Sequence, residues 1–298
     1  MTEDRYQKAE SGNLPSAARH LASVLPPLLL EAERVASAVR QGVHGRRRAG
    51  AGESFWQFRR YATGDAAQRI DWRQSARSDK LFVREREWEA AQTAYLWADA
   101  SGSMRYASRK DIPQKIERAR VLMLALADLL LRGGEKVTWL AREPIAVAGK
   151  GGLERIAARF DEQQDKNLPP ALPFARHAHM ILCSDFLMES GDLRDLMRRH
   201  AALNLKGALV HVLDPAERDL PFAGRIEMRG FENEAPLLLA NAGVLREAYR
   251  ARMEEHRARL RQYAQSAGWF YIAHTTDTQP GQALLQIYEA LAADRQGL

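Results

Sequence analysis

The sequence contains almost no cysteine, and its apolar runs are short. Cys183 is the one cysteine among 298 residues, so a scaffold held by disulfide bonds is excluded and a reducing compartment is expected. The longest apolar stretch near the N-terminus, residues 21–30, is too short to span a bilayer and contains Pro26 and Pro27. The sequence also begins without the basic leader typical of a signal peptide. These absences predict a protein located in the cytoplasm, without a membrane span.

Positive charge is concentrated in one part of the chain. The net charge is +6, and between Arg40 and Arg86 twelve lysines and arginines accompany five acidic residues. A run of three arginines, residues 46–48, lies in this part beside glycines. Such a segment can bind nucleic acid or an acidic partner, or it can be a solvated basic loop. Because no zinc-finger, helix-turn-helix or RNA-binding signature accompanies the charge, nucleic-acid binding through this segment stays an alternative only.

Segments typical of strands and helices alternate from about residue 91 onward. Strands are expected near 93–99, 136–141, 145–148, 179–183, 206–213 and 269–274, a two-stranded excursion over 225–240, and helices near 113–132, 153–160, 191–203, 241–267 and 280–293. This alternation predicts an α/β fold with a mostly parallel sheet covered by helices on both faces. We therefore expect an N-terminal helical segment over 1–41, a basic and aromatic segment over 42–90 packed on the core, and an α/β domain over 91–298.

The most informative stretch is residues 95–104, where an apolar run ends in Asp99-Ala-Ser101-Gly-Ser103. The pattern is typical of a buried parallel strand that meets a polar loop, and ligands bind at the carboxyl ends of such strands. One carboxylate and two hydroxyls at alternate positions offer only oxygen, which suits a hard cation such as Mg²⁺. These residue types are also ordinary in turns, and Ser103 can simply cap the next helix.

A second carboxylate follows a second expected strand. Asp185 closes the strand expected over 179–183, as Asp99 closes the first one. Because the carboxyl ends of parallel strands lie at one edge of a sheet, the two carboxylates can face one cation. The predicted metal ligands are therefore Asp99, Ser101, Ser103 and Asp185, with Mg²⁺ as the expected ion and Mn²⁺ or Ca²⁺ as alternatives.

The same residues give little support to catalysis. A metal-dependent phosphoryl hydrolase would use these carboxylates, but a phosphatase of the haloacid dehalogenase type needs an acid two residues after Asp99, where Ser101 stands. The sequence contains no Gly-x-Ser-x-Gly elbow, and no pair of its histidines has convincing zinc spacing. We expect a non-enzymatic protein and keep phosphoryl hydrolysis as the alternative.

An arginine-rich and aromatic block precedes the first expected strand of the α/β domain. In order, it contains Phe55, Arg59-x-Tyr61, Gly64-Asp65, Ile70-Asp71-Trp72, Ala76-Arg77 and Leu81-x-Val83-Arg84-Glu85. Together with Asp99-x-Ser101-x-Ser103-Met104, this block resembles the bacterial family called domain of unknown function 58. The resemblance runs from about residue 40 to 290. The Asp-x-Ser-x-Ser spacing is also similar to the metal-ion-dependent adhesion site of von Willebrand factor A domains.

The resemblance implies a fold, a metal and a partner. The implied fold is von Willebrand factor A-like (Rossmann-like), and Asp185 matches an aspartate that such domains carry in the later position. The implied function is that of a protein–protein adaptor, in which a partner's carboxylate completes the coordination of the cation. The implied partners are an AAA+ ATPase of the MoxR type and other von Willebrand A proteins. One departure concerns a threonine ligand usual in such domains, because residues 139–183 contain no Thr or Ser.

The block itself supports two interpretations. Arginine forks paired with carboxylates beside aromatic rings can form a buried polar network that holds the fold together. The same side chains can instead bind a partner. The residues predicted to serve one of these roles are Arg59, Tyr61, Asp65, Asp71, Trp72, Arg77, Arg84 and Glu85.

Overall fold

The computed structural model forms two compact units. The main unit comprises residues 1–41 and 92–298, and the small unit comprises residues 42–91. The residues that the structure describes are 27–41, 55–62, 70–77, 80–86, 92–149, 151–160, 168–228 and 237–296. The predicted packing of segment 42–90 on the core stays a prediction.

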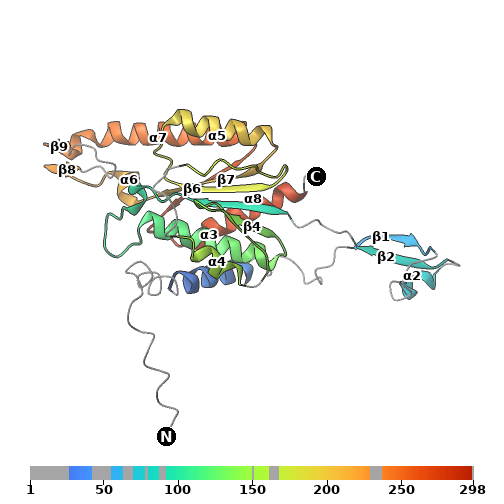
Figure 1. Ribbon diagram of the computed structural model, residues 1–298. Coiled ribbons are helices and arrows are strands. Elements are labelled where there is room, and N and C mark those ends of the chain that lie inside the picture. The colour runs from blue at the N-terminus through green and yellow to red at the C-terminus, as the bar shows by residue number, and fades with distance from the viewer. Residues whose placement is uncertain are drawn as a thin grey trace, which may run out of the picture. The chain divides into compact units, whose positions relative to one another are not determined.

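A six-stranded sheet lies at the centre of the main unit, in the order β10-β7-β6-β3-β4-β5 (Figure 1). Its strands are β3 (Thr93–Ala98), β4 (Lys136–Trp139), β5 (Ile145–Val147), β6 (His179–Ser184), β7 (Lys206–Leu213) and β10 (Phe270–Thr275). All neighbouring strands pair in parallel except β4 and β5. The three central strands β3, β6 and β7 are buried almost throughout, as expected of parallel strands that are covered on both faces.

Helices cover both faces of this sheet (Figure 1). The helices of the main unit are α3 (Lys115–Arg132), α4 (Gly152–Ala157), α5 (Ser190–Ala202), α6 (Pro215–Asp219), α7 (Ala242–Ser266) and α8 (Pro280–Gln296), together with a 3₁₀ turn η2 (Gly102–Arg105). Helices α3 and α8 contact each other on one face, and α5 and α7 contact each other on the other. This arrangement confirms the predicted mostly parallel α/β sheet with two helical layers.

The apolar pattern of each layer explains its position. On the α5–α7 side, Trp97 and Leu182 of the sheet belong to one buried cluster with Leu193 and Leu260 of the helices. Close contact between β6 and β7 requires Gly207, because a Cβ atom there would lie 1.8 Å from the carbonyl oxygen of Met180.

A helix over residues 27–41 forms part of the main unit and contacts α3. Its residues Leu28, Ala32, Val35 and Val39 are buried at helical spacing, which defines one apolar face. The predicted helical segment 1–41 is therefore seen over its last part, and residues 1–26 lie outside the described residues. Within the described ranges, none of the helices combines the length and the apolar character needed to cross a membrane.

Two strands form the predicted excursion between β7 and α7. Strand β8 (Ile226–Met228) pairs antiparallel with β9 (Leu237–Leu239). The predicted helix over 113–132 begins at Lys115, and the predicted strand over 136–141 ends at Trp139. The sequence pattern thus located these elements to within a few residues.

The small unit contains a two-stranded sheet and a short helix. Strand β1 (Phe55–Arg60) pairs antiparallel with β2 (Phe82–Arg86), and α2 (Trp72–Ser75) lies between them in the chain. The Oδ1 atom of Asp71 accepts a hydrogen bond from the backbone N–H of Gln74 at 3.0 Å, so Asp71 caps this helix.

Candidate functional site

Three neighbouring strands end in polar residues at one edge of the main sheet. Strand β3 is followed by Asp99, strand β6 ends in Ser184 and is followed by Asp185, and strand β7 is followed by Asp214. All four of these polar side chains are buried. The structure therefore brings the two predicted carboxylates, Asp99 and Asp185, to the carboxyl ends of adjacent parallel strands.

Asp99 is surrounded by uncharged hydrogen-bond donors. Its Oδ1 atom accepts from the backbone N–H of Ser101 at 2.8 Å, and its Oδ2 atom accepts from the hydroxyl of Ser184 at 2.6 Å. Burial raises the pKa of Asp99 to about 6, although the hydrogen bond from Ser184 and that from the backbone of Ser101 oppose the rise. The negative charge of Asp185 nearby adds to the increase.

The two predicted hydroxyl ligands lie close together. The Oγ atoms of Ser101 and Ser103 are 3.2 Å apart, and Ser101 is buried. The N-cap of the following η2 turn is Ser101, not Ser103, and its side chain makes no capping hydrogen bond. The alternative that Ser103 caps the next helix is therefore wrong.

Asp185 has a charged partner. The Nζ atom of Lys115 donates to its Oδ2 atom at 2.8 Å, and both side chains are almost fully buried, at 0% and 2% exposure. Lys115 also donates to Glu217, and the second oxygen of Asp185 accepts from the backbone N–H of Leu187 at 3.2 Å. Burial alone would lower the pKa of Lys115, but the two carboxylates outweigh it and raise the pKa, so the ammonium group is charged.

Glu217 connects this ion pair to the end of β7. Its Oε2 atom accepts from the backbone N–H of Asp214 at 2.9 Å, while Oδ1 of Asp214 accepts from the backbone N–H of Ala216 at 2.8 Å, which makes a capping box for α6. The Oδ2 atom of Asp214 accepts from the backbone N–H of Ser108 at 2.8 Å. These contacts tie the loop after β3 to the loop after β7.

The donor set fits a divalent metal poorly. Every carboxylate oxygen of Asp99 and Asp185 already accepts a hydrogen bond from the protein, and one of them is bound by an ammonium group. Over the ranges that the structure describes, no three or more His, Cys, Asp or Glu side chains are placed to hold a metal ion. The hydroxyls of Ser101 and Ser103 are the predicted ligands whose arrangement is compatible with a cation. The metal ligand set stays a prediction.

Sequence reasoning missed four residues of this edge, namely Lys115, Ser184, Asp214 and Glu217. A signal existed for three of them. Ser184 directly precedes Asp185, and Asp214-Pro-Ala-Glu217 is the pattern of a capping box after a strand. Lys115 stands in the first turn of its helix, where a cation is unfavourable, and such a residue is ordinarily exposed.

The small-unit residues are partly described. Trp72 and Tyr61 are 65% and 37% exposed, and which of the two predicted roles they serve stays a prediction. Asp71 serves as the helix cap, and Arg77 is exposed. Asp65 and the side chains of Arg59, Arg84 and Glu85 lie outside the described residues, as does the basic run 46–48.

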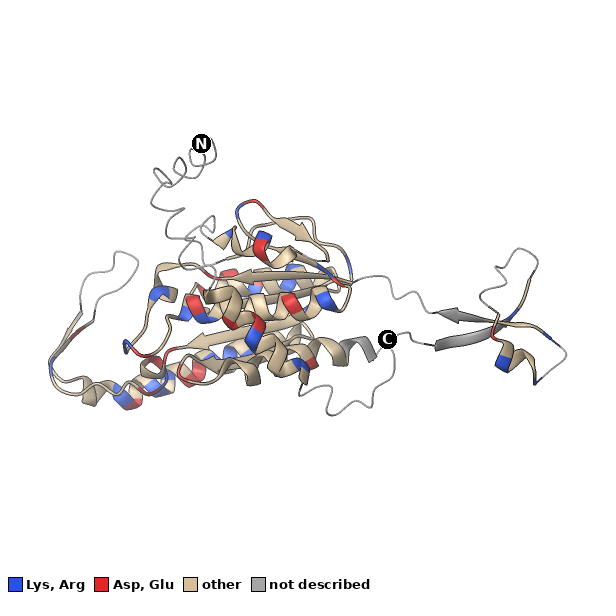
Figure 2. Ribbon diagram, turned by 90° about the horizontal axis from the view of Figure 1, so that it is seen from below, with Lys and Arg blue, Asp and Glu red and all other residues tan. Residues whose placement is uncertain are grey.

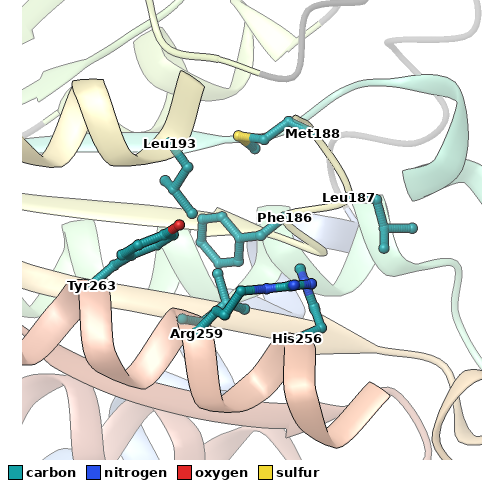
Figure 3. A pocket seen from close by; sticks show the side chains of 8 residues that line it. Phe186, Leu187, Met188, Leu193, His256, Arg259 and Tyr263 are labelled. Atoms are coloured by element: carbon teal, nitrogen blue, oxygen red, sulfur yellow. The ribbon is translucent and has the colours of Figure 1, made fainter. Parts of the chain in front are cut away.

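A pocket opens beside Asp185, between α7 and the segment that follows β6 (Figure 3). It has a volume of about 260 Å³ and is lined by Phe186, Leu187, Met188, Leu193, His256, Arg259, Leu260 and Tyr263. Leu187 is 55% exposed, and Phe186 has a φ of 53°, which is strained for an aromatic residue. Burial lowers the pKa of His256, so Arg259 carries the positive charge of this pocket at neutral pH.

The sequence matches a known family. A family model described as "Protein of unknown function DUF58" matches residues 57–259, which is more than half of the chain. The chain belongs to the DUF58 family. Uncharacterised proteins of Mycobacterium tuberculosis and Mycobacterium bovis are each 23% identical to this DUF58 chain over 303 aligned residues, covering 93% of this chain and 90% of theirs.

Solved structures with a similar fold match the DUF58 chain at low identity. BatB from Bacteroides thetaiotaomicron and an aerotolerance-related membrane protein from Bacteroides fragilis each have a TM-score of 0.41 at 15% identity, covering 68% of this chain and all of theirs. The SpRpn10 VWA domain has a TM-score of 0.33 at 10% identity and covers 65% of this chain and 94% of its own. The sheet order and the two helical layers confirm the predicted mostly parallel α/β fold, and its von Willebrand factor A-like character stays a prediction.

The predicted cytoplasmic location requires correction. The Bacteroides fragilis structure is described as a membrane protein, and a further match, from Vibrio fischeri, is described as a membrane spanning protein (TM-score 0.18, 15% identity). These descriptions contradict the expectation drawn from the sequence, and it is withdrawn for this DUF58 chain.

Proposed function

We propose that this DUF58 chain is a non-enzymatic adaptor whose partner docks on the pocket beside Asp185. The observation that carries the proposal is the position of Leu187. This large apolar side chain is 55% exposed on the loop that directly follows Asp185, at the sheet edge where α/β folds bind ligands. An exposed apolar side chain at the rim of a pocket can provide a central contact for a protein partner.

The pocket indicates the chemistry of the partner. Phe186, Leu193 and Leu260 line the pocket with apolar groups, and Arg259, which pairs with Glu255 at 3.2 Å, adds a guanidinium group at its rim. Basic residues outnumber acidic ones on this helix, which carries both kinds along its length (Figure 2). It contains six arginines and three glutamates (Arg246, Arg250, Arg252, Arg257, Arg259, Arg261; Glu247, Glu254, Glu255). The occupant that we propose is a partner segment with an apolar side chain next to a carboxylate, which would meet Arg259.

The burial of the carboxylates supports an adaptor over a hydrolase. A general acid or base must reach the substrate, whereas Asp99 and Asp185 are almost completely buried and hydrogen-bonded by the protein. The family resemblance provides the candidate partner, an AAA+ ATPase of the MoxR type. The proposed assembly therefore joins such an ATPase to the α7 side of the main unit.

The test measures binding of the full chain to a purified MoxR-type ATPase from the same bacterium. Leu187→Ala should weaken the affinity at least about tenfold, because a central apolar contact contributes on the order of 1–2 kcal/mol. Leu30→Ala is the matched control, since Leu30 is 70% exposed on the helix over 27–41, which contacts α3 on the other side of the sheet. Equal affinity of wild type and Leu187→Ala, or no binding by wild type, would contradict the proposal.

A second assay addresses the hydrolase alternative. Wild type and Asp99→Asn are compared for turnover of a generic phosphate ester in the presence of Mg²⁺. No turnover above background is expected from either protein. Turnover by wild type that Asp99→Asn abolishes would favour phosphoryl hydrolysis and overturn the non-enzymatic assignment.

A further inference from the structure

We propose that the ammonium group of Lys115 is the resident cation of the strand-end site and takes the place that the resemblance gives to a divalent metal. The proposal concerns the interior of the site and holds for any partner. It therefore does not depend on the docking of an ATPase at Leu187.

The contacts of Lys115 are those of a bound cation. Its side chain is fully buried, and its Nζ atom donates to Asp185 at 2.8 Å and to Glu217. Asp185 is one of the predicted metal ligands, and its Oδ2 atom is bound by this ammonium group. A strongly hydrated group such as an ammonium is buried completely only where protein oxygens replace its water.

Two features of the local structure disfavour a charged lysine at position 115. Lys115 is the first residue of α3, where the partial positive charge of the helix N-terminus disfavours an ammonium group. Burial disfavours the charge as well. The two carboxylates overcome both effects, so they and the ammonium group form one buried ionic cluster rather than a helix surface pair.

The ammonium group competes directly with a metal. Mg²⁺ requires near-octahedral oxygen ligands at about 2.0–2.1 Å and keeps several waters, whereas Asp185 is held by Lys115 and by the backbone of Leu187. A dication that used Asp185 would also lie beside a positive charge. Of the other predicted ligands, the hydroxyls of Ser101 and Ser103 are neutral and weak. Both oxygens of Asp99 already accept hydrogen bonds, from the backbone of Ser101 and from the hydroxyl of Ser184. The site is therefore complete without a metal.

Lys115 also connects three parts of the fold. It extends from α3 to the end of β6 through Asp185 and to α6 through Glu217, whose other oxygen accepts from the backbone of Asp214 after β7. A metal in a von Willebrand A-like site would join strand ends in the same way. The ammonium group thus supplies the connection as a permanent part of the chain.

The experiment titrates the full chain with Mn²⁺ and measures free Mn²⁺ by electron paramagnetic resonance. Wild type and Asp99→Asn should bind Mn²⁺ equally weakly, without a stoichiometric site. Lys115→Met should gain one site, bound at least about tenfold more tightly than any site of wild type, and adding Asp185→Asn to this variant should remove it. If Lys115→Met does not fold, Lys115→Met with Glu217→Gln leaves one fewer unpaired carboxylate and is used instead.

Two results would overturn the proposal. The first is one Mn²⁺ bound by wild type and lost in Asp99→Asn, which would show a metal site alongside Lys115. The second is a folded Lys115→Met protein that binds Mn²⁺ no more tightly than wild type. If neither variant folds, the comparison of wild type with Asp99→Asn still decides between a metal site and none. No partner protein is present, so the outcome is independent of the Leu187 test.

Discussion

Asp99 and Asp185 follow adjacent strands and look equivalent in the sequence, but their surroundings differ. Asp185 is paired with the ammonium group of Lys115 at 2.8 Å. Asp99 accepts hydrogen bonds from a hydroxyl and a backbone N–H, and burial raises its pKa to about 6. The carboxylate of Asp185 is therefore neutralised within the fold, whereas that of Asp99 is held by uncharged hydrogen-bond donors.

This difference shows that two acidic residues at one sheet edge can have opposite effects on stability. Removing one partner of a buried ion pair strongly destabilises the folded protein, because the remaining charge stays buried without a partner. A buried carboxylate with neutral partners destabilises the folded protein whenever it is ionised. Substitutions at the two positions can separate these cases.

The largest effect is expected from removing the shared cation. Lys115→Met keeps an unbranched side chain of nearly the same length but leaves Asp185 and Glu217 without the ammonium group, so the free energy of unfolding at pH 7 should fall by about 3–5 kcal/mol. Urea unfolding followed by circular dichroism measures the change. Lys136→Met is the control, since Lys136 is exposed at the start of β4, and a change of less than about 0.5 kcal/mol is expected there. Equal losses in both variants would show that the pair contributes nothing.

Asparagine at the two positions should change stability in opposite directions. Asp99 has a folded pKa of about 6 against 3.8 for the ordinary group, so the folded state binds more protons between these pH values and stability falls as the pH rises through them. Asp99→Asn should therefore increase the free energy of unfolding by up to about 3 kcal/mol at pH 7, and this gain should disappear below about pH 4.

Asp185→Asn should instead lower the stability at pH 7, because it leaves Lys115 with Glu217 alone. Unfolding of both variants at pH 3.5 and pH 7 measures the contrast. A loss of stability at pH 7 in Asp99→Asn, similar to that in Asp185→Asn, would indicate that Asp99 is also held by a cation.

A smaller effect is expected at the hydroxyl between the two carboxylates. Ser184 donates to Asp99 at 2.6 Å and its oxygen accepts from the backbone N–H of Phe186 at 2.8 Å. Ser184→Ala should lower the free energy of unfolding by about 1.5–3 kcal/mol at pH 7, the range for a hydrogen bond to a charged group. Ser103→Ala, at a less buried hydroxyl, should change it by less than about 1 kcal/mol, and equal losses would contradict the special role of Ser184.

The smallest effect is expected from chelation. With Lys115 as the resident cation, removal of divalent ions by EDTA should leave the midpoint of thermal unfolding unchanged, whereas loss of a tightly bound metal would lower it. Differential scanning calorimetry with EDTA or with Mg²⁺ measures the shift. A decrease in EDTA that Mg²⁺ reverses, and that Asp99→Asn abolishes, would contradict the ammonium site.

The sequence allowed the fold to be predicted more completely than the site. Apolar runs that end in Asp99, Asp185 and Asp214 located the central strands, since a parallel strand buried on both faces is apolar along its whole length. The partner of Asp185 is 70 residues away and looks like an ordinary surface lysine at a helix start. Only the path of α3 against the sheet places it inside.

The pocket beside Asp185 depended on long-range packing too. Leu187 and Arg259 come from segments far apart in the sequence, and nothing local to either shows that they line one pocket. The sequence shows which side chains are present, but the three-dimensional path of the chain decides which of them meet at one pocket.

The burial of Cys183 makes this chain convenient for site-specific labelling. The thiol lies inside β6 next to Ser184, and burial raises its pKa, so it exists as an unreactive neutral group. A single cysteine introduced on the surface would therefore react with a maleimide dye without removal of the native one. A fluorophore placed at position 244, where Val244 is 75% exposed at the start of α7, would report partner association from outside the pocket.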